Sequence, residues 1–283
     1  MEPIAERFRQ AWDEVLAGRS GRFSLDLRSL DGPVASRDAD ASHYAASTMK
    51  LPVLMALLRD RAAHVQGALG SVLVHDRFPS ASGGVFELRQ PDDQDDQTWS
   101  RIGTEVDLLD LADKMITVSS NIATDLILER IGFESVRNWL ADHGLDSRLQ
   151  VARLIGDAAA QDAGATNSVT ASGLATLMAT IATGSDSATA LEILGRQTHR
   201  DMIPAGLPDG TWSASKGGWV IGVKHDVAFV RPVAAPEYVL AICTTADLPD
   251  AAGMELVAWL SAVTWEQWSR WHASKEVAVE RRP

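Results

Sequence analysis

The sequence predicts an α/β fold, in its α+β form, in which an antiparallel sheet flanked by helices carries an inserted all-helical lobe. Strand-like patterns occur near both ends of the chain, first around residues 22–36 and again from Thr211 to Thr245. Between them, apolar residues recur every three or four positions, as in helices that bury one face. We therefore expect residues 1–46 and 204–283 to form the sheet lobe, and residues 47–203 to form the helical lobe, of one domain overall.

The predicted elements follow in order, with recognisable ends. An opening helix near Ile4–Leu16 precedes a hairpin of residues 22–27 and 33–36. Glycines fall where helix ends are expected in the middle of the chain, at positions 132, 144 and 184. The middle helices are predicted at Leu108–Ile116, Asn121–Ile131, Ser135–Asp142 and Ala171–Thr183, and a last helix from Pro249 to about His272.

Composition narrows the classes of partner. A formal net charge of −12 disfavours binding to nucleic acid or to an anionic membrane. No apolar run approaches the ~18 residues that a membrane span requires. The N-terminal segment lacks the apolar core of a signal peptide and Cys243 has no second cysteine to pair with, so we expect a cytoplasmic protein unless the chain was trimmed from an exported one.

No metal or other cofactor is expected, because the H-E-x-x-H and C-x-x-C patterns are both absent. The oligomeric state stays open at this level.

Ser47-Thr48-Met49-Lys50 is the motif that carries most chemical information. Residues three apart share a helix face, so the Lys50 amine can sit beside the Ser47 hydroxyl and help to deprotonate it. The apolar run of residues 49–58 predicts the buried helix that this arrangement needs. Ser213-Ala214-Ser215-Lys216 has the same S-x-x-K pattern, but its neighbours alternate as in a strand, where residues three apart face opposite ways.

Two further motifs follow in the order that one enzyme family uses. Ser119-Ser120-Asn121 and Lys216-Gly217-Gly218 stand where S-D-N and K-T-G follow S-x-x-K in class A β-lactamases. With the opening hairpin and the strands after Lys216, the chain resembles the serine β-lactamase and penicillin-binding peptidase superfamily over nearly its whole length. Within that superfamily it looks most like the class A β-lactamases.

The resemblance implies roles for the first two motifs. Ser47 would be the nucleophile, and Lys50 would be its base or would orient a water molecule. Ser119 would pass a proton to the leaving nitrogen, and Asn121 would hydrogen-bond the amide side chain of the substrate. The implied substrate is a β-lactam, and the implied biological role is antibiotic resistance.

The third motif would supply the electrostatic part of the site. By the same resemblance, Lys216 would place positive charge near Ser119 and the substrate carboxylate. Gly218 and Trp219 would border the bound substrate, and the backbone N–H groups of Ser47 and Trp219 would form the oxyanion hole. His225, or Lys224 beside it, would provide a positive charge for a carboxylate.

Three departures from the class A pattern limit what the resemblance implies. Ser120 replaces the usual Asp, and Gly217 replaces a Thr or Ser whose hydroxyl holds the substrate carboxylate. The largest departure concerns the Ω-loop, which Arg153 opens and Asn167 begins to close. Ile155 stands where the deacylating Glu belongs, and no glutamate occurs between Arg153 and Asn167.

Loss of such a base slows a proton-transfer step by about 100- to 10,000-fold, enough to leave the acyl-enzyme intact. Asp157 or Asp162 are candidate replacement bases. The alternative for Asp157 is a structural one, in which it caps a turn or pairs with Arg153.

Two surface features have a structural and a functional interpretation. The acidic run Asp92–Asp96 lies in a polar stretch near residues 79–101, which predicts a solvated loop, with a lid over the site as the alternative. Trp265, Trp268 and Trp271 are three residues apart, which favours packing against the sheet over a binding or dimer face.

Three hypotheses about function remain. The first is a serine hydrolase that forms an acyl-enzyme on Ser47 with a small acyl substrate, a β-lactam by resemblance. The second is an esterase, amidase or D-amino-acid peptidase on the same fold, which the lost glutamate and Gly217 favour. The third is a noncatalytic penicillin or peptide binder with very slow deacylation.

Overall fold

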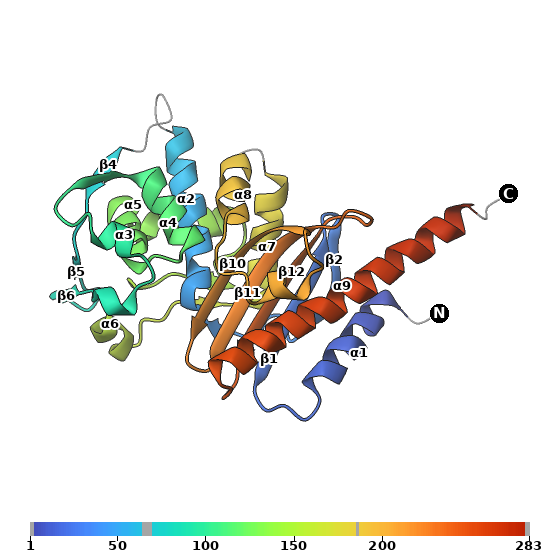
Figure 1. The fold of residues 1–283 in the computed structure, drawn as a ribbon. Helices are drawn as coiled ribbons and strands as arrows, with labels where there is room; N and C mark the ends of the chain where they lie inside the picture. The colour runs from blue at the N-terminus through green and yellow to red at the C-terminus, as the bar shows by residue number, and fades with distance from the viewer. Residues whose placement is uncertain (1–2, 64–69, 185–186, 281–283) are drawn as a thin grey trace. The chain divides into compact units, whose positions relative to one another are not determined.

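The structure is a computed structural model that describes residues 3–63, 70–184 and 187–280 (Figure 1). It divides into two compact units: Met1–Thr48, Thr170–Gly184 and His199–Pro283 form the first, and Met49–Val169 with Ser185–Thr198 form the second. These boundaries differ from the predicted ones, because residues 47–48, 170–184 and 199–203 belong with the sheet. Residues 1–2 and 281–283, at the ends of the predicted sheet lobe, lie outside the described residues.

A five-stranded antiparallel sheet forms the centre of the first unit (Figure 1). Its strand order, β10-β11-β12-β1-β2, makes β10 an edge strand and places Gly218 opposite His225 in the β10–β11 register. The strands are β1 (Arg22–Ser29), β2 (Gly32–Arg37), β10 (Trp212–Val220), β11 (Val223–Arg231) and β12 (Tyr238–Thr245). The two-residue strand β3 (His43–Tyr44) follows β2 in the chain.

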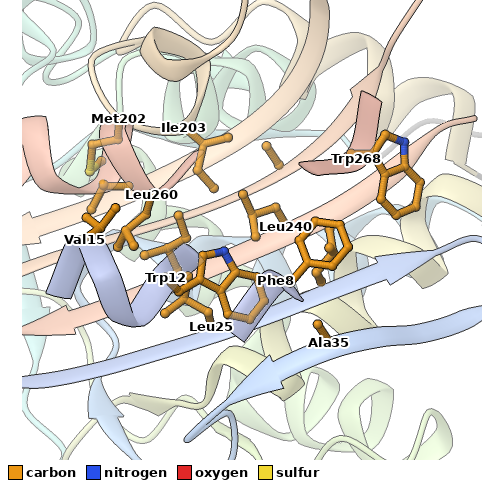
Figure 2. Close-up of a cluster of buried hydrophobic side chains, with 14 of the residues drawn as sticks. Phe8, Trp12, Val15, Leu25, Ala35, Met202, Ile203, Leu240, Leu260 and Trp268 are labelled. Carbon is orange, nitrogen blue, oxygen red and sulfur yellow. The ribbon is translucent and has the colours of Figure 1, made fainter. Parts of the chain in front are cut away.

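Helices α1 (Ile4–Leu16) and α9 (Asp250–Glu280) pack on one face of this sheet. Trp12, Leu240 and Trp268 belong to the apolar cluster that joins them to the strands (Figure 2). Trp268 is fully buried and Trp265 and Trp271 pack against the cluster, so the prediction that these tryptophans are core residues is confirmed.

Helix α7 (Ala171–Thr183) contacts β1, β11 and β12 and contributes no residue to that cluster, and it covers the other face of the sheet (Figure 1). The prediction that α7 belongs to the helical lobe was wrong. The apolar period of a helix does not reveal whether its buried face packs against a sheet or against another helix.

The second unit is built around the packing of α2 (Lys50–Ala63) against α5 (Asn121–Asp142). Helix α4 (Leu108–Thr117) contacts both, and α8 (Ser187–Gly195) packs on α4. Gly132 has φ 75° and ψ 154° and interrupts α5, which accounts for the two separate helices that the sequence predicted here. A non-glycine residue would be strained at such a positive φ.

Short elements complete the second unit. The polar stretch near residues 79–101 is not the predicted loop, because it folds into small strands and helical turns. These elements are β6 (Val85–Glu87), η3 (Gln90–Asp92) and α3 (Asp96–Trp99), preceded by β5 (Arg77–Pro79). The paired strands β4 (Ser71–Leu73) and β7 (Glu105–Asp107) lie on either side of them in the chain. Further along the chain lie β8 (Leu149–Gln150), α6 (Ala158–Asp162) and β9 (Ser168–Val169). Among the described helices, none is long and apolar enough to cross a membrane.

Candidate active site

Ser47 lies in the 3-10 turn η1 (Ala46–Met49), which runs directly into α2. The turn is held by Thr48, whose N–H and hydroxyl both donate to the Ala45 carbonyl, at 3.2 and 2.6 Å. Ala46 has φ 44°, a conformation that alanine rarely adopts and that costs on the order of 1 kcal/mol. Ser47 is half-buried while Ala45, Ala46 and Thr48 are buried, so the strained turn presents the serine.

Gly218 of β10 lies against this turn. A Cβ atom on Gly218 would come within 2.7 Å of the Ser47 nitrogen and 2.8 Å of the Thr48 nitrogen, closer than any side chain permits. Glycine therefore lets the backbone of β10 approach the Ser47 amide, as an oxyanion site built from backbone N–H groups requires. The Trp219 side chain is half-buried and meets the His199 ring edge-on at 4.8 Å.

Lys216 is fully buried, and its Nζ donates to the Gly217 carbonyl at 2.7 Å. Burial raises the pKa of Asp226 to about 7, while the N–H of Ile203 and the charge of Lys216 act in the opposite direction. A Cβ atom at Gly217 would lie 2.5 Å from the Met202 Cε. The Met202 methyl group therefore fills the space into which a threonine at position 217 would extend.

His225 does not take the position that the sequence predicted for it. Its ring is fully buried, with Nδ1 accepting from the Thr244 N–H at 3.0 Å and Nε2 lying 2.9 Å from the Tyr44 carbonyl. Nε2 must then carry the proton, and burial lowers the pKa of His225 to about 3. His225 is a neutral structural residue, and we do not retain it as a substrate ligand.

Lys224 is also committed elsewhere. Its Nζ donates to the carbonyls of Val220 and Val223 and pairs with Asp250 at 2.8 Å. The predicted carboxylate-binding charge at this edge of the sheet is therefore supplied by neither residue.

In the second unit, Lys50 is fully buried at the start of α2. Its Nζ donates to the Ser119 carbonyl at 2.7 Å and to the Asn121 Oδ1 at 2.9 Å, and lies 3.2 Å from the Ser119 hydroxyl. Burial lowers the pKa of Lys50 to about 7, against the opposing charges of Asp93 and Asp125. A large share of Lys50 is therefore the neutral amine at neutral pH, with a lone pair that can accept a proton.

The Ser119-Ser120-Asn121 motif forms the turn between α4 and α5. Ser120, which replaces the Asp of the family motif, is the N-cap of α5 and accepts from the Ala123 N–H at 3.2 Å. Ser119 has φ 62°, so the turn holds it in a conformation that few non-glycine residues adopt. Such strain at a candidate catalytic residue persists only where the surrounding structure imposes it.

Asp93 supports the same turn and was missed by the sequence interpretation. Its carboxylate accepts from the backbone N–H groups of Asn121 and Ile122, both at 2.8 Å, and from Trp99 Nε1 at 3.0 Å. A negative charge is favourable at the first turn of a helix, where N–H groups lack partners. The acidic run thus contributes to the site as a cap of α5.

The loop from Val151 to Asn167 corresponds to the predicted Ω-loop. The β8–β9 pair closes its base, and Asn167 spans it by accepting from the N–H groups of Ala152 and Arg153. Ile155 is half-buried, and its N–H donates to Asp125 Oδ1 at 2.9 Å.

Asp157, the candidate replacement base, is fully buried as the N-cap of α6. It accepts hydrogen bonds from the Ala160 N–H, the Ala81 N–H and the Ser80 hydroxyl, at 2.8–3.0 Å. Burial acts to raise the pKa of Asp157, but these hydrogen bonds outweigh it and lower the value. Its observed contacts are those of the structural alternative.

A cavity of about 290 Å³ adjoins the Asn121 end of this cluster, lined by Leu88, Asp93, Trp99 and Ile155 among others. A larger cavity of about 610 Å³ is lined by residues of α3, α4 and α8, and its described lining includes none of the predicted site residues. The larger of these two cavities is therefore not the one beside the candidate catalytic residues. No group of three or more potential metal ligands occurs among the described residues.

The structure thus brings the predicted residues together in two groups. Ser47 and Gly218 lie together in the first unit, in which Lys216 and Trp219 flank Gly218 in β10. Lys50, Ser119 and Asn121 form the second group, in the second unit. Asp157 is held apart as the cap of α6.

Comparison with known proteins places this geometry in context. A family model described as the β-lactamase enzyme family matches residues 7–268. A comparison with functionally curated proteins found no match.

Solved structures share the fold at low sequence identity. A PBP-A mutant, in an acyl-enzyme complex with penicillin G, aligns with a TM-score of 0.77 and 23% identity, covering 95% of this chain and 98% of that one. A class A β-lactamase from Bacteroides cellulosilyticus aligns with a TM-score of 0.79 and 16% identity, covering 95% of this chain and 100% of that one. A β-lactamase from Sphaerobacter thermophilus aligns with a TM-score of 0.74 and 20% identity, covering 94% of this chain and 97% of that one.

Proposed function

The chain belongs to the β-lactamase enzyme family, and on this premise we propose that it is a serine hydrolase that forms an acyl-enzyme on Ser47, with a β-lactam as the substrate class. The observation that carries the proposal is the buried Lys50 amine, with its lowered pKa of about 7 and its contacts to Ser119 and Asn121. Ser47 and Lys50 are three residues apart on one helical run, a spacing that favours proton transfer between them.

Acylation then proceeds through three proton transfers. Lys50, as the neutral amine, takes the Ser47 proton while Oγ attacks the acyl carbon and its carbonyl becomes an oxyanion. The N–H groups of Ser47 and Trp219 stabilise that oxyanion. Ser119 passes a proton to the leaving nitrogen as the carbon–nitrogen bond breaks, and recovers one from the Lys50 ammonium. The acyl group is left on Ser47, and Lys50 returns to the amine.

Deacylation needs a base of its own, and positions 155 and 157 of the loop do not supply one. The Ile155 side chain cannot accept a proton, and the oxygens of Asp157 are occupied by three donors. We therefore propose that the acyl-enzyme is long-lived when its acyl group is that of a penicillin. The related PBP-A mutant in an acyl-enzyme complex with penicillin G is consistent with a persistent adduct on this fold.

A second candidate function is an esterase, amidase or D-amino-acid peptidase. The observation that favours it is the Met202 methyl group against Gly217, because no hydroxyl extends from position 217 to hold a carboxylate. Substrates without an anchored carboxylate then lose less binding than a penicillin does.

Intact mass spectrometry over time, after mixing with a penicillin, tests the proposal. We expect one acyl group per chain on Ser47, and none on Ser47→Ala. Rapid nitrocefin hydrolysis without a lasting adduct would instead indicate a β-lactamase with another deacylating base. Turnover of an activated ester, together with a stable penicillin adduct, would favour the esterase or peptidase.

A further inference from the structure

Asp125 is a buried acid that takes no part in the proposed acylation steps. It lies on α5 one helical turn after Asn121, so the two side chains project from the same side of the helix. Asp125 is fully buried, and its Oδ1 accepts from the Ile155 N–H at 2.9 Å. Its Oδ2 is also buried, with no hydrogen-bond partner in the part of the chain that the structure describes.

Charged groups face Asp125 from three parts of the second unit. They are Lys50 on α2, Asp93 between η3 and α3, and Arg153 in the loop that also carries Ile155. Lys50 donates to Asn121, one turn away on the same face of α5. Asp125 therefore joins the surroundings of the candidate base to the loop in which the class A glutamate is replaced.

The hydrogen bonds of Asp125 identify its charge state. An ionised carboxylate in the interior is costly unless several donors or a close cation satisfy it. Asp125 has one N–H donor on Oδ1, and no donor among the described residues reaches Oδ2. Burial raises the pKa of Asp125 well above its ordinary value, although the Ile155 N–H and the charge of Lys50 oppose this.

We propose that Asp125 is a positioning residue that acts as a neutral acid: it holds the Ile155 segment through Oδ1 and leaves Lys50 as the neutral amine. The proposal rests on the proposed function, since it is acylation of Ser47 that needs an amine at Lys50.

The alternative charge state would work against catalysis. An ionised Asp125 near Lys50 would stabilise the ammonium and raise the pKa of Lys50 by about 1–3 units. An ammonium has no lone pair with which to take the Ser47 proton. A neutral Asp125 does not raise the pKa of Lys50, so burial lowers that pKa against the charge of Asp93 alone.

Nuclear magnetic resonance can test the charge state directly. The chain has five lysines, at positions 50, 114, 216, 224 and 275, so Cε-labelled lysine gives few signals, and Lys50→Arg assigns the one from Lys50. Asp125→Asn removes the ionisable group and keeps an oxygen for the Ile155 N–H. We expect the Lys50 titration midpoint to be unchanged in this variant. A midpoint lower by about one unit or more would overturn the proposal, because it would identify Asp125 as an ionised partner.

A second signal comes from Cγ-labelled aspartate at mildly alkaline pH, at which Asp226, with a pKa of about 7, is largely ionised. We expect a protonated carboxyl resonance in the wild type that disappears in Asp125→Asn. Its absence from the wild-type spectrum would contradict the proposal. Glu87→Gln is the matched control, because it neutralises a carboxyl that lines the nearby cavity and should change neither spectrum.

Kinetics separate the positioning role from general support of the fold. Asp125→Asn should acylate Ser47 at close to the wild-type rate, whereas Asp125→Ala, which leaves the Ile155 N–H without an acceptor, should be slower by about tenfold. Equal loss in both variants would overturn the positioning role. Asp125→Ser is the second neutral variant to use if Asp125→Asn does not fold.

The two measurements also separate this proposal from the proposed function. The spectra require no substrate, so they decide the charge of Asp125 even if Ser47 forms no adduct. A wild type that never acylates would overturn the proposed function and the link to acylation, while the spectra would still report the charge state.

Discussion

Two regions of the second unit contrast in how they use polar groups: the cluster of Lys50, Ser119 and Asn121, and the loop from Val151 to Asn167. In the cluster, polar atoms meet at an amine whose pKa lies near 7, where a proton can be taken and returned. In the loop, polar side chains hold the backbone, as Asn167 and Asp157 do. Under the proposed function, this contrast predicts that the protein acylates faster than it hydrolyses the acyl-enzyme.

The two buried acids beside the loop show what decides their charge. Asp157 and Asp125 are both inaccessible to solvent. Asp157 accepts hydrogen bonds from three donors and has a lowered pKa, whereas Asp125 accepts from one backbone N–H and has a raised pKa. The difference in pKa follows from two causes: the carboxyl of Asp125 is more strongly desolvated, and it accepts fewer hydrogen bonds than that of Asp157.

Removal of the nucleophile should have the largest effect on the acylation rate. Ser47→Ala deletes the only atom proposed to carry the acyl group, so acylation should fall by about 10,000-fold or more. Intact mass after penicillin treatment measures the adduct, and thermal unfolding followed by circular dichroism checks that the fold is retained. Labelling of the variant at the wild-type rate would remove Ser47 from the mechanism.

A base introduced into the loop should give the loop a proton acceptor, as the cluster has in Lys50. Ile155→Glu places a carboxylate at the position that the class A pattern gives to its deacylating residue, and should shorten the adduct lifetime by about 100-fold or more. Ile155→Gln has nearly the same shape and cannot act as a base. If both variants shorten the lifetime equally, a looser loop, and not the new base, would be the cause.

The pH dependence of acylation should report the amine of the cluster. Only the neutral form of Lys50 accepts the Ser47 proton, so the rate should rise with pH and level off above a midpoint near 7. Below the midpoint the rate should fall by about tenfold per pH unit. Rapid-mixing measurements on the wild type provide this profile, and a midpoint near the ordinary lysine value would contradict a neutral Lys50 amine at neutral pH.

The smallest effect on chemistry is expected at the cap of α6. Asp157→Ala should lower the free energy of unfolding by about 1–2 kcal/mol, because three donors lose their acceptor, and should leave the adduct lifetime nearly unchanged. Since folding lowers the pKa of Asp157, its contribution is present above the unfolded-state pKa and is lost as pH falls through the folded-state value. Urea unfolding at several pH values measures both effects, and a much longer adduct lifetime would restore Asp157 as a base.

Local patterns were enough to predict much of this molecule. The helix from Ile4 to Leu16 and the helix from Ala171 to Thr183 have the predicted bounds, because apolar period and terminal residues mark both ends. The second S-x-x-K pattern lies on β10, as the alternation around Lys216 predicted.

Features that depend on long-range packing could not be predicted in this way. Asp125 lies in no motif, and only the fold brings the Ile155 N–H to it, 30 residues along the chain. The sequence interpretation gave His225 a charge for a substrate carboxylate, yet its ring is hydrogen-bonded to the backbone of Tyr44 and Thr244. The role of Asp93 as a cap of α5 also depends on a contact 28 residues away. Sequence spacing reveals such pairs only when they share a helix face or a strand.

The ratio of the acylation rate to the deacylation rate, measured for Ser47 of the wild type with one penicillin by time-resolved intact mass spectrometry, tests the account most directly. An acyl-enzyme that forms fully and then persists would show that the cluster acts without a deacylating loop, as predicted. Continuous turnover, with the free enzyme predominating at every time, would show that a base for deacylation exists, and would contradict the contrast between the two regions.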